Sequence, residues 1–499
     1  MKKSFRHTRI WITFLLFALL QLLLASAGAS TLQKAEPSDL GNDPRIKDAL
    51  GLLEVWVDAR LAYQHLPGIS MAVVYDQELL WSHGFGVSDL ETKKPTTPQT
   101  IYSICSISKL FTSIGVMQLY DEGKLRLDDQ LADLIPWFNI EEAHKGSGPI
   151  TVRGILSHAS GLPRESDFPY WTGPEFQFPS REQIKARLSA QSTLYPAEQY
   201  FQYSNLGLTL AGELIPELSG QSYGEYVKAR ILDPLELRDT TPEMPANQQG
   251  KRLATVYGAL TRQGTRPKMP FFQARGIAPA AGYASTVEDL AKFASWQFRL
   301  LESGGEEVLK ASTLHEMQRV QWIDPDWKEG TSRGLGFWVQ RQDNKNFVGH
   351  GGSCPGYRSE LRLNPDDKVA VVFMANATAI DPTLFTRQAH KMVGSAITDA
   401  TENPGKGKSD DPILNKYTGL YRGDWGETAV INWKGALAFL ELPTDDPLED
   451  LETLKQEDAD TFRRVRADGK QGEQIRFDLD ANGQVARMWR HSNYDTKVR

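Results

Sequence analysis

Two apolar segments with strand character lie at opposite ends of a long stretch of the chain, and this arrangement limits the folds open to it. Residues 69–75 (ISMAVVY) and 368–374 (KVAVVFM) are rich in branched and aromatic side chains, and both are short. Between them the pattern is largely helical and is broken by proline and glycine. We therefore expect a chain that leaves a sheet, builds a helical region and returns to the sheet.

Neighbouring segments extend this expected sheet. Residues 78–85 follow the first strand after the tight connection Asp76-Gln77, which predicts a hairpin. Three more strand-like runs precede the last strand: 337–340, 346–349 and 358–363. Residues 46–63 carry apolar side chains at helical spacing and predict a helix that opens the domain. The fold class expected is α+β, an antiparallel sheet flanked by helices with a helical subdomain.

A polar, glycine- and proline-rich segment, 401–412, divides the rest of the chain. It has no apolar residue to bury, so we interpret it as a linker. A chain of 499 residues also exceeds the size at which one hydrophobic core stops growing. We expect a main domain at 45–400 and, from hairpin signals such as Lys434-Gly435 and Asn482-Gly483, a small β-barrel or β-sandwich at 413–499.

The N-terminus has the pattern of a secretory signal peptide at 1–27, followed by a polar lead-in at 28–44. Four basic residues precede an apolar run at 10–24, and Ala25-Ser-Ala27 supplies the small residues of a cleavage site. The alternative is an uncleaved membrane anchor, although the run is shorter than the roughly 20 residues that span a bilayer. The protein is expected to be exported, to the periplasm or the outside of the cell.

Composition excludes several classes of function. A net charge of −7 gives no support for nucleic-acid binding. The nine histidines show neither H-x-H nor H-E-x-x-H spacing, so we expect no metal site and no cofactor. The expected partner is a small-molecule or peptide substrate, and the oligomeric state stays open. Cys105 and Cys354 are either buried thiols or a single disulfide.

Ser106-Ile-Ser-Lys109 is the S-x-x-K pattern of this chain, at the start of a helical segment. At that spacing the serine hydroxyl and the lysine amine share one face of the helix. A serine needs a base to become a nucleophile, and a desolvated lysine can be neutral and accept its proton. Taken alone, the motif is weak because both residue types are common.

Two later motifs offer complementary groups. Tyr203-Ser-Asn205 places a phenol, which can move protons, beside an amide that can bind a substrate carbonyl or Lys109. The alternative is a turn that caps the following helix. His350-Gly-Gly352 follows a strand-like run, where glycines allow a ligand or another backbone to approach closely, although a simple glycine turn fits the same pattern.

In this order and spacing, the three motifs resemble the S-x-x-K, Y-x-N and K-T-G or H-x-G elements of class C β-lactamases and related esterases, D-aminopeptidases and D,D-peptidases, within the serine β-lactamase and penicillin-binding-protein superfamily. Residues 156–163, 282–290, 334–338 and 350–359 are similar to that family as well. The resemblance implies catalysis by Ser106, Lys109 and Tyr203, and substrate binding by Asn205.

The resemblance also implies which residues line the opposite side of the active site. It implies substrate binding by His350, Gly351 and Gly352, and an oxyanion hole formed by the backbone N–H groups of Ser106 and Ser353. An acyl-enzyme on Ser106 would form and be hydrolysed without a metal.

One departure from the family pattern limits the substrates that we expect. His350 stands where many β-lactamases carry the lysine of K-T-G, and a neutral imidazole is a poorer partner for a substrate carboxylate. This favours an esterase or D-amino-acid peptidase over a β-lactamase proper. Arg358 is either a replacement partner for a carboxylate or part of a surface ion pair. A non-catalytic penicillin-binding-like receptor or regulator is the alternative from another class.

Overall fold

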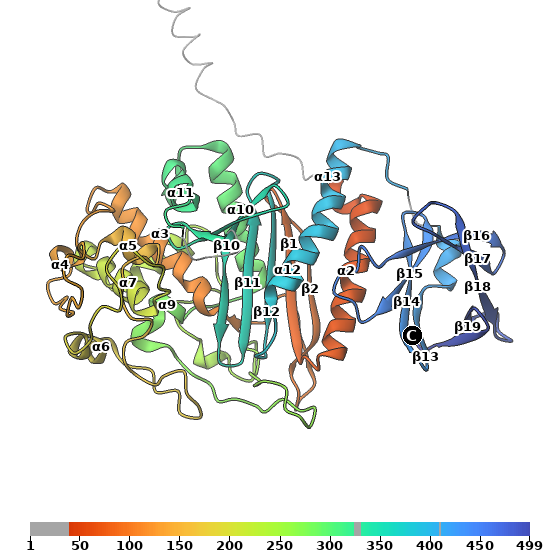
Figure 1. Ribbon diagram of the computed structural model, residues 1–499, viewed down its shortest axis with the longest axis horizontal. Coiled ribbons are helices and arrows are strands. Elements are labelled where there is room, and N and C mark those ends of the chain that lie inside the picture. Colours follow the sequence, from red (N-terminus) through yellow and green to blue (C-terminus); the bar gives the residue numbers. More distant parts are fainter. Residues whose placement is uncertain (1–38, 324–330, 409–410) are drawn as a thin grey trace, which may run out of the picture. The chain divides into compact units, whose positions relative to one another are not determined.

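The computed structural model describes residues 39–499 apart from 324–330 and 409–410 (Figure 1). The predicted signal peptide, 1–27, and most of the predicted lead-in, 28–44, lie outside the described residues. Within the described ranges, no helix combines the length and the apolar character that crossing a membrane requires.

An eight-stranded antiparallel sheet forms the centre of the main domain (Figure 1). In spatial order its strands are β3 (Lys94–Pro95), β2 (Glu78–Asp89), β1 (Gly68–Tyr75), β12 (Val369–Ala375), β11 (Tyr357–Asn364), β10 (Lys345–Cys354), β9 (Trp338–Gln342) and β8 (Thr331–Arg333). Strand β1 pairs with β12 from Ile69 opposite Ala375 to Tyr75 opposite Val369. The chain therefore leaves this sheet after β3 and returns to it at β8, beyond the helical region, as the sequence predicted.

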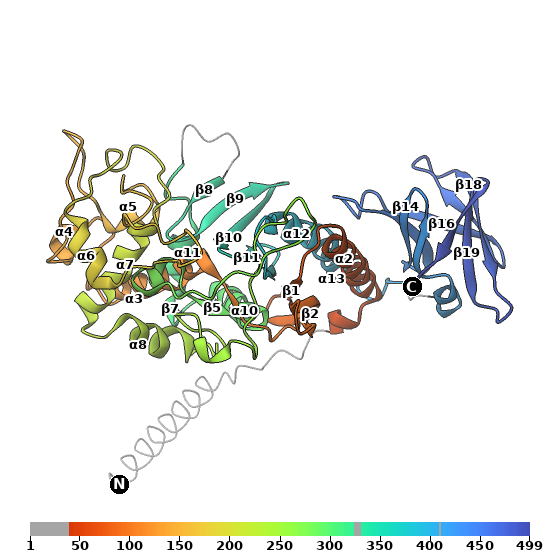
Figure 2. The same cartoon turned by 90° about the horizontal axis from the view of Figure 1, so that it is seen from below.

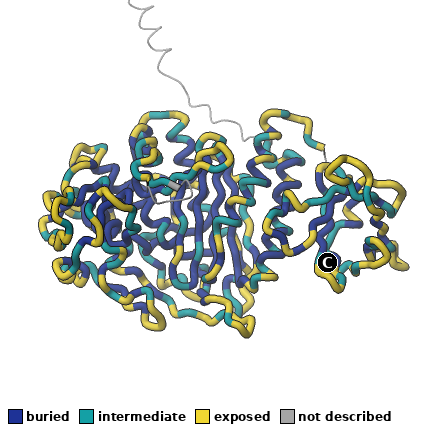
Figure 3. The backbone as a smooth tube through the Cα atoms, viewed as in Figure 1, coloured by how far each residue is buried: buried dark blue, intermediate teal, exposed yellow. Residues whose placement is uncertain are grey.

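The central strands are apolar along their whole length because both faces of the sheet are covered. In β12, Ala370, Val372 and Met374 belong to the core shared with the helical region, and Val371 and Phe373 belong to a second core on the other face. This alternation has the period of two expected for a strand. Figure 3 shows the resulting band of buried backbone across the sheet.

Three helices cover the second face of the sheet: α2 (Pro44–Tyr63), α12 (Pro382–Ala389) and α13 (Ser395–Glu402) (Figures 1 and 2). Helix α2 begins where the sequence favours it, because Pro44 occupies its first turn and the Asp43 side chain accepts a hydrogen bond from Arg45 N at 2.9 Å. Trp56 and Phe385 meet within this layer, with ring centroids 5.1 Å apart.

Helices and short turns on the first face build the helical region. The helices are α3 (Ser108–Asp121), α4 (Leu131–Leu134), α5 (Val152–Leu156), α6 (Arg181–Leu188), α7 (Asn205–Ser219), α8 (Tyr223–Val227), α9 (Ala278–Ala281), α10 (Val287–Ser303) and α11 (Ala311–Gln318). Two small two-stranded sheets join them: β4 (Tyr102–Ser103) with β5 (Ala284–Ser285), and β6 (Glu306–Glu307) with β7 (Leu309–Lys310). Helices α3, α7 and α9 pack on one another and place the site described below.

Strands near the C-terminus close into an eight-stranded antiparallel barrel, so the barrel alternative of the sequence prediction is the one observed. Its strands are β13 (Gly419–Gly423), β14 (Gly426–Trp433), β15 (Ala436–Leu442), β16 (Glu452–Asp458), β17 (Thr461–Val465), β18 (Gln471–Leu479), β19 (Val485–Arg490) and β20 (Asn493–Lys497). Side chains such as Tyr421, Leu437 and Phe477 form a core of its own. Trp56 Nε1 of α2 donates to Thr444 O at 2.9 Å, next to the barrel. The proposed domain limits, 45–400 and 413–499, stay predictions.

Candidate active site

Ser106 lies in the 3₁₀ turn η2 (Cys105–Ile107), directly before α3. The turn is anchored by Ile104 N, which donates to Tyr283 O at 2.9 Å, and by Ser108 Oγ, which donates to Cys105 O. Ser106 is partly exposed, whereas its neighbours Cys105 and Ile107 are buried. The fold therefore presents this one hydroxyl to solvent from an otherwise buried segment.

Lys109, in the first turn of α3, is fully buried and has three polar neighbours. Its Nζ lies 3.1 Å from Ser106 Oγ, 2.8 Å from Asn205 Oδ1 and 2.8 Å from Ala280 O. The amide oxygen and the carbonyl can only accept hydrogen bonds. A neutral lysine would donate both of its N–H groups to them, and this leaves its lone pair for the Ser106 hydroxyl.

Burial lowers the pKa of Lys109, and this is the largest influence on it. The charges of Tyr203 and Glu165 and a hydrogen bond to Tyr203 raise the same pKa, and the charge of Arg164 lowers it further. Desolvation favours the uncharged amine. The amine is thus shifted toward the neutral form that can take a proton from serine.

Tyr203 precedes α7 and lies beside Lys109. Lys109 Nζ is 4.8 Å from the centroid of the Tyr203 ring, and the Arg164 guanidinium carbon is 5.0 Å from it. The His158 ring packs against the same phenol, with centroids 4.2 Å apart. His158 Nδ1 accepts a hydrogen bond from Ser204 N at 3.1 Å, so this histidine has a structural role.

Asn205 connects Lys109 to a carboxylate that sequence reasoning missed. Its Nδ2 donates to both oxygens of Glu165, at 2.9 and 3.1 Å, while its Oδ1 accepts from Lys109. Tyr170 also donates to Glu165, and Arg164 lies 3.2 Å from it. Ser204, rather than Asn205, caps α7, because its Oγ accepts from Gly207 N at 2.8 Å. Asn205 thus faces the site, and the capping alternative applies to its neighbour.

His350 lies within β10, whereas the sequence prediction placed it after a strand that ends at Gly349. The strand continues beyond Gly349 because residues 348–354 pair with β11. His350 is 5% exposed, and burial together with the charge of Lys109 lowers its pKa to about 3. Nδ1 lies 2.6 Å from Gly351 O, so the neutral ring donates from Nδ1 and keeps Nε2 as an acceptor. A neutral His350 supplies no charge for a substrate carboxylate.

Gly352 is needed where β10 meets η2. A Cβ at this position would lie 2.3 Å from Ile104 O and 2.1 Å from Ser359 Oγ, whereas a Cβ on Gly351 would have its nearest contact at 3.7 Å, with Ser359 O. Ser359 Oγ donates to Ile104 O at 3.0 Å and so joins the two segments. The second glycine of the motif therefore serves a close approach of two backbones.

The hairpin register determines where the Ser353 N–H points. Cys354 and Tyr357 face each other across the two-residue turn Pro355-Gly356 and form its closing, hydrogen-bonded pair. Bonded and non-bonded pairs alternate in an antiparallel ladder, so the next pair, Ser353 with Arg358, is non-bonded. The Ser353 N–H therefore points away from β11. On that side, β9 pairs with β10 only as far as Gly349, and η2 lies beyond.

A disulfide joins the two sides of the site. It links Cys105, the residue before Ser106, to Cys354, the residue after Ser353, with their Cα atoms 5.8 Å apart. Of the two sequence alternatives for the cysteines, the bridge is the one that the structure contains. Ser106 and Ser353 are thus held by one covalent link between their neighbours.

Two arginines near the site differ in their surroundings. Arg358 donates to Cys354 O at 3.1 Å and to Tyr357 O at 2.7 Å, so its guanidinium binds carbonyls of its own hairpin. Arg333, which the sequence reasoning missed, is close enough to Tyr203, His158 and His350 for charge interactions with each. Residues 334–338 resemble a segment of the family, but nothing in the sequence distinguished Arg333, which directly precedes them.

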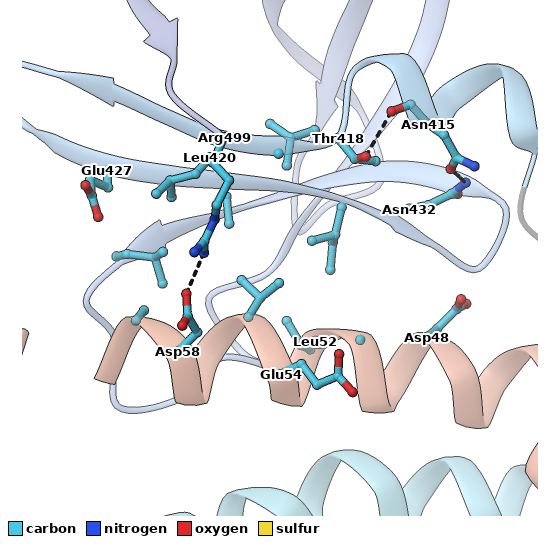
Figure 4. Close-up of a pocket in the computed structure, with 18 of the residues that line it drawn as sticks. Asp48, Leu52, Glu54, Asp58, Asn415, Thr418, Leu420, Glu427, Asn432 and Arg499 are labelled. Atoms are coloured by element: carbon cyan, nitrogen blue, oxygen red, sulfur yellow. Dashed lines mark hydrogen bonds and ion pairs between the residues drawn. The ribbon is translucent and has the colours of Figure 1, made fainter. Parts of the chain in front are cut away.

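A cavity of about 640 Å³ lies away from these residues, between α2 and strands β13 and β14 (Figure 4). Its acidic side chains already have partners: Asp58 pairs with Arg499 at 2.5 Å, and Glu54 accepts from Trp81 Nε1 at 2.8 Å. Across the described part of the chain, no group of three or more His, Cys, Asp or Glu side chains is arranged to hold a metal ion. The nucleophile and base described above therefore define the candidate site.

Known proteins are similar to this chain in sequence. The family model described as Beta-lactamase matches residues 53–390. The chain is 27% identical over 363 residues to "Beta-lactamase-like protein 2" of Dictyostelium discoideum, which covers 70% of this chain and 64% of that protein. The chain thus spans less than two thirds of that relative's length.

Solved structures show the same fold. The octameric penicillin-binding protein homologue from Pyrococcus abyssi has a TM-score of 0.61 at 24% identity, over 90% of this chain and all of the other. The D-amino acid amidase from Ochrobactrum anthropi SV3, complexed with D-phenylalanine, has a TM-score of 0.58 at 23% identity, over 71% of this chain and 99% of the other. The first of these structures extends to most of the chain.

Proposed function

Because this chain belongs to the Beta-lactamase family, we propose that it is a serine hydrolase that cleaves esters or amides through an acyl-enzyme on Ser106. The observation that carries the proposal is the position of a buried amine, Lys109 Nζ, 3.1 Å from the one partly exposed hydroxyl of its segment. The other two neighbours of that amine are acceptors, so its lone pair is available to the serine.

The proposed reaction follows from these positions. Lys109 takes the proton of Ser106 as Oγ attacks the substrate carbonyl carbon, and the N–H groups of Ser106 and Ser353 stabilise the resulting oxyanion. Collapse of the tetrahedral intermediate breaks the ester or amide bond, and Tyr203 donates its phenolic proton to the leaving group. Water then attacks the acyl-enzyme carbonyl carbon and gives a proton to Tyr203. Lys109 returns its proton to Ser106 Oγ as the acid product leaves, which restores the enzyme.

One carboxylate beside the site, Glu165, is the basis for proposing a substrate with a free amino group. Glu165 contacts Asn205 and has about a quarter of its side chain exposed, so its carboxylate can accept a hydrogen bond from a substrate ammonium. His350 is neutral and gives no charge to a substrate carboxylate. The structural neighbour named as a D-amino acid amidase supports the same class. We therefore place D-amino-acid amides and esters ahead of β-lactams.

Turnover and intact mass test the proposed reaction. Wild type and Ser106→Ala are compared on p-nitrophenyl esters, D-aminoacyl p-nitroanilides and nitrocefin, with a fluorophosphonate to trap the serine. We expect turnover of an ester or D-aminoacyl substrate and one covalent adduct, both lost in Ser106→Ala. Efficient turnover of nitrocefin alone would favour a β-lactamase, and a wild type without turnover or adduct would favour a receptor.

A matched pair of substrates tests the role of Glu165. Glu165→Gln keeps the size of the side chain and removes its charge. We expect KM to rise about tenfold or more for a D-aminoacyl p-nitroanilide and to change little for its N-acetyl derivative, because charge-assisted hydrogen bonds are worth roughly 1.5–3 kcal/mol. Equal effects on both substrates would show that Glu165 does not bind the ammonium.

Export is a second part of the proposal. The basic, apolar and small-residue pattern of 1–27 supports it, and so does the disulfide, since such bonds persist in oxidising compartments. N-terminal sequencing of protein recovered outside the cytoplasm should begin at Gly28. Recovery of full-length chain only in the membrane fraction would favour the uncleaved anchor.

A further inference from the structure

The disulfide lies where the two proposed oxyanion donors meet. We propose that the Cys105–Cys354 bond is a positioning element of the oxyanion hole, which keeps the N–H groups of Ser106 and Ser353 at the separation that catalysis requires. The proposal rests on the acyl-enzyme reaction proposed above. Neither cysteine touches the substrate in this scheme, so both act through their neighbours in the chain.

Each donor is one residue away from a bridged cysteine. Cys105 has φ of +50°, a left-handed conformation that costs free energy in a residue with a side chain, and it directly precedes Ser106. Cys354 closes the β10–β11 hairpin directly after Ser353. A covalent bond between these residues limits relative movement of the two backbone segments in the direction that would separate the donors.

The strand ladder alone does not provide this restraint. Strand β9 pairs with β10 only from Lys345 to Gly349, so among the described residues no strand neighbours the edge at 350–354 that faces η2. Ser359 Oγ, from the partner strand β11, donates to Ile104 O at 3.0 Å and holds η2 on that side. The disulfide is the bond that ties the edge of β10 itself to η2.

The surroundings of the bond favour a permanent restraint over a freely reversible one. Cys105 is fully buried and Cys354 is 4% exposed. A reductant must therefore reach a sulfur that is almost completely covered, and thiol–disulfide exchange depends on that access. We expect the bond to survive mild reductants and to be present whenever the enzyme is active.

The test compares wild type with Cys105→Ala/Cys354→Ala on the substrate that wild type turns over. We expect kcat to fall about 10- to 100-fold, because a displacement of about 1 Å in a reacting group can cost a factor of 10². KM should change less than twofold, since the residues proposed to bind the ground state are unaltered. Rates are measured at a temperature where circular dichroism shows both proteins to be folded.

A second variant with a loss of stability comparable to that of the alanine pair separates the positioning role of the disulfide from a general loss of stability. Phe373→Leu weakens the core on the other face of the sheet, to which the buried residues of η2 do not belong, and should lower Tm while kcat stays near wild type. If the alanine pair does not fold, folded wild type treated with a strong phosphine reductant replaces it. Reduction breaks the Sγ–Sγ bond and transfers two electrons and two protons to the chain, which intact mass detects as two added hydrogens. Reoxidation should restore kcat.

The outcomes distinguish the two proposals. A wild-type kcat in the folded double variant, or in reduced and folded wild type, would overturn the positioning role and leave the acyl-enzyme reaction intact. Absence of turnover and of a Ser106 adduct in wild type would overturn the reaction and this role with it. A fall in kcat at constant KM, recovered on reoxidation and absent from Phe373→Leu, is the expected result.

Discussion

Lys109 Nζ lies 3.1 Å from Ser106 Oγ although the lysine side chain is completely buried. The nearest groups that could stabilise its positive charge are an amide oxygen, a carbonyl and the phenol of Tyr203. Burial of an ammonium is costly, so desolvation lowers the pKa of Lys109 and shifts it toward the free amine, although the charge of Glu165 opposes this shift. This environment makes a common S-x-x-K pattern chemically specific.

Replacing Lys109 by methionine should abolish most turnover while preserving the fold. Methionine retains an unbranched chain of similar length and removes the proton acceptor. We expect kcat to fall by about 10² to 10⁴, the usual contribution of a general base. Lys292→Met, in α10, where the half-exposed Lys292 pairs with the buried Asp289, is the control and should keep wild-type kcat. Full activity of Lys109→Met would assign the proton transfer to another group.

Two neighbouring charges should move the acidic limb of the pH–rate profile in opposite directions. Lys109 must be neutral to act as a base, so activity is lost as pH falls through its pKa. The charge of Glu165 raises that pKa and the charge of Arg164 lowers it. Glu165→Gln should therefore shift the limb of kcat/KM to lower pH, and Arg164→Gln should shift it to higher pH.

An N-acetylated ester is the substrate for this measurement, because it has no ammonium group for Glu165 to bind. His350→Gln serves as a reference, since the low pKa of His350 keeps it out of the titration. Shifts of the same sign in the two charge variants would contradict Lys109 as the titrating base.

Acid should destabilise the protein partly through His390 in η6 (His390–Gly394). Burial and the charge of Arg362 lower its pKa from 6.5 to about 3. Between these values the unfolded chain binds a proton that the folded chain does not, so the free energy of unfolding decreases as pH falls from 6.5 toward 3. The slope from one histidine is at most about 1.4 kcal/mol per pH unit.

His390→Gln should reduce that slope, because the amide can still donate to Arg362 O in place of Nε2 and does not titrate. Urea midpoints of both proteins, measured at several pH values through this window, provide the test. Parallel dependence on pH in wild type and variant would show that His390 is protonated equally in the folded and unfolded states.

Alanine at two adjacent glycines should have different consequences. Gly352→Ala forces its Cβ against Ile104 O and Ser359 Oγ, so it should lower Tm by several degrees and slow labelling of Ser106 by a fluorophosphonate. Gly351→Ala meets only ordinary van der Waals contact and should leave Tm within about a degree of wild type. Equal Tm values for the two variants would show that β10 and η2 are not tightly apposed.

The C-terminal barrel contains strands that the local sequence pattern did not predict. The hairpin signals Lys434-Gly435 and Asn482-Gly483 predicted the strands on either side of them, β14, β15, β18 and β19, whereas β13, β16, β17 and β20 were not predicted. In β16, Glu452–Asp458, Leu454 is the one buried side chain and most of the others are charged or polar. Closure of the barrel supplies hydrogen-bond partners to such a strand whatever its side chains prefer.

The sequence by itself determined the alternation of strand and helix, the two apolar strands that pair across the whole main domain, and the spacing that places Lys109 one turn after Ser106. These features follow from period and local propensity, which a chain carries without its partners. The tertiary structure decided which charges surround Lys109, how far His350 is desolvated and that Cys105 bonds to Cys354. Those depend on distances between segments far apart in the chain, and distance and burial set electrostatic free energies while sequence spacing does not.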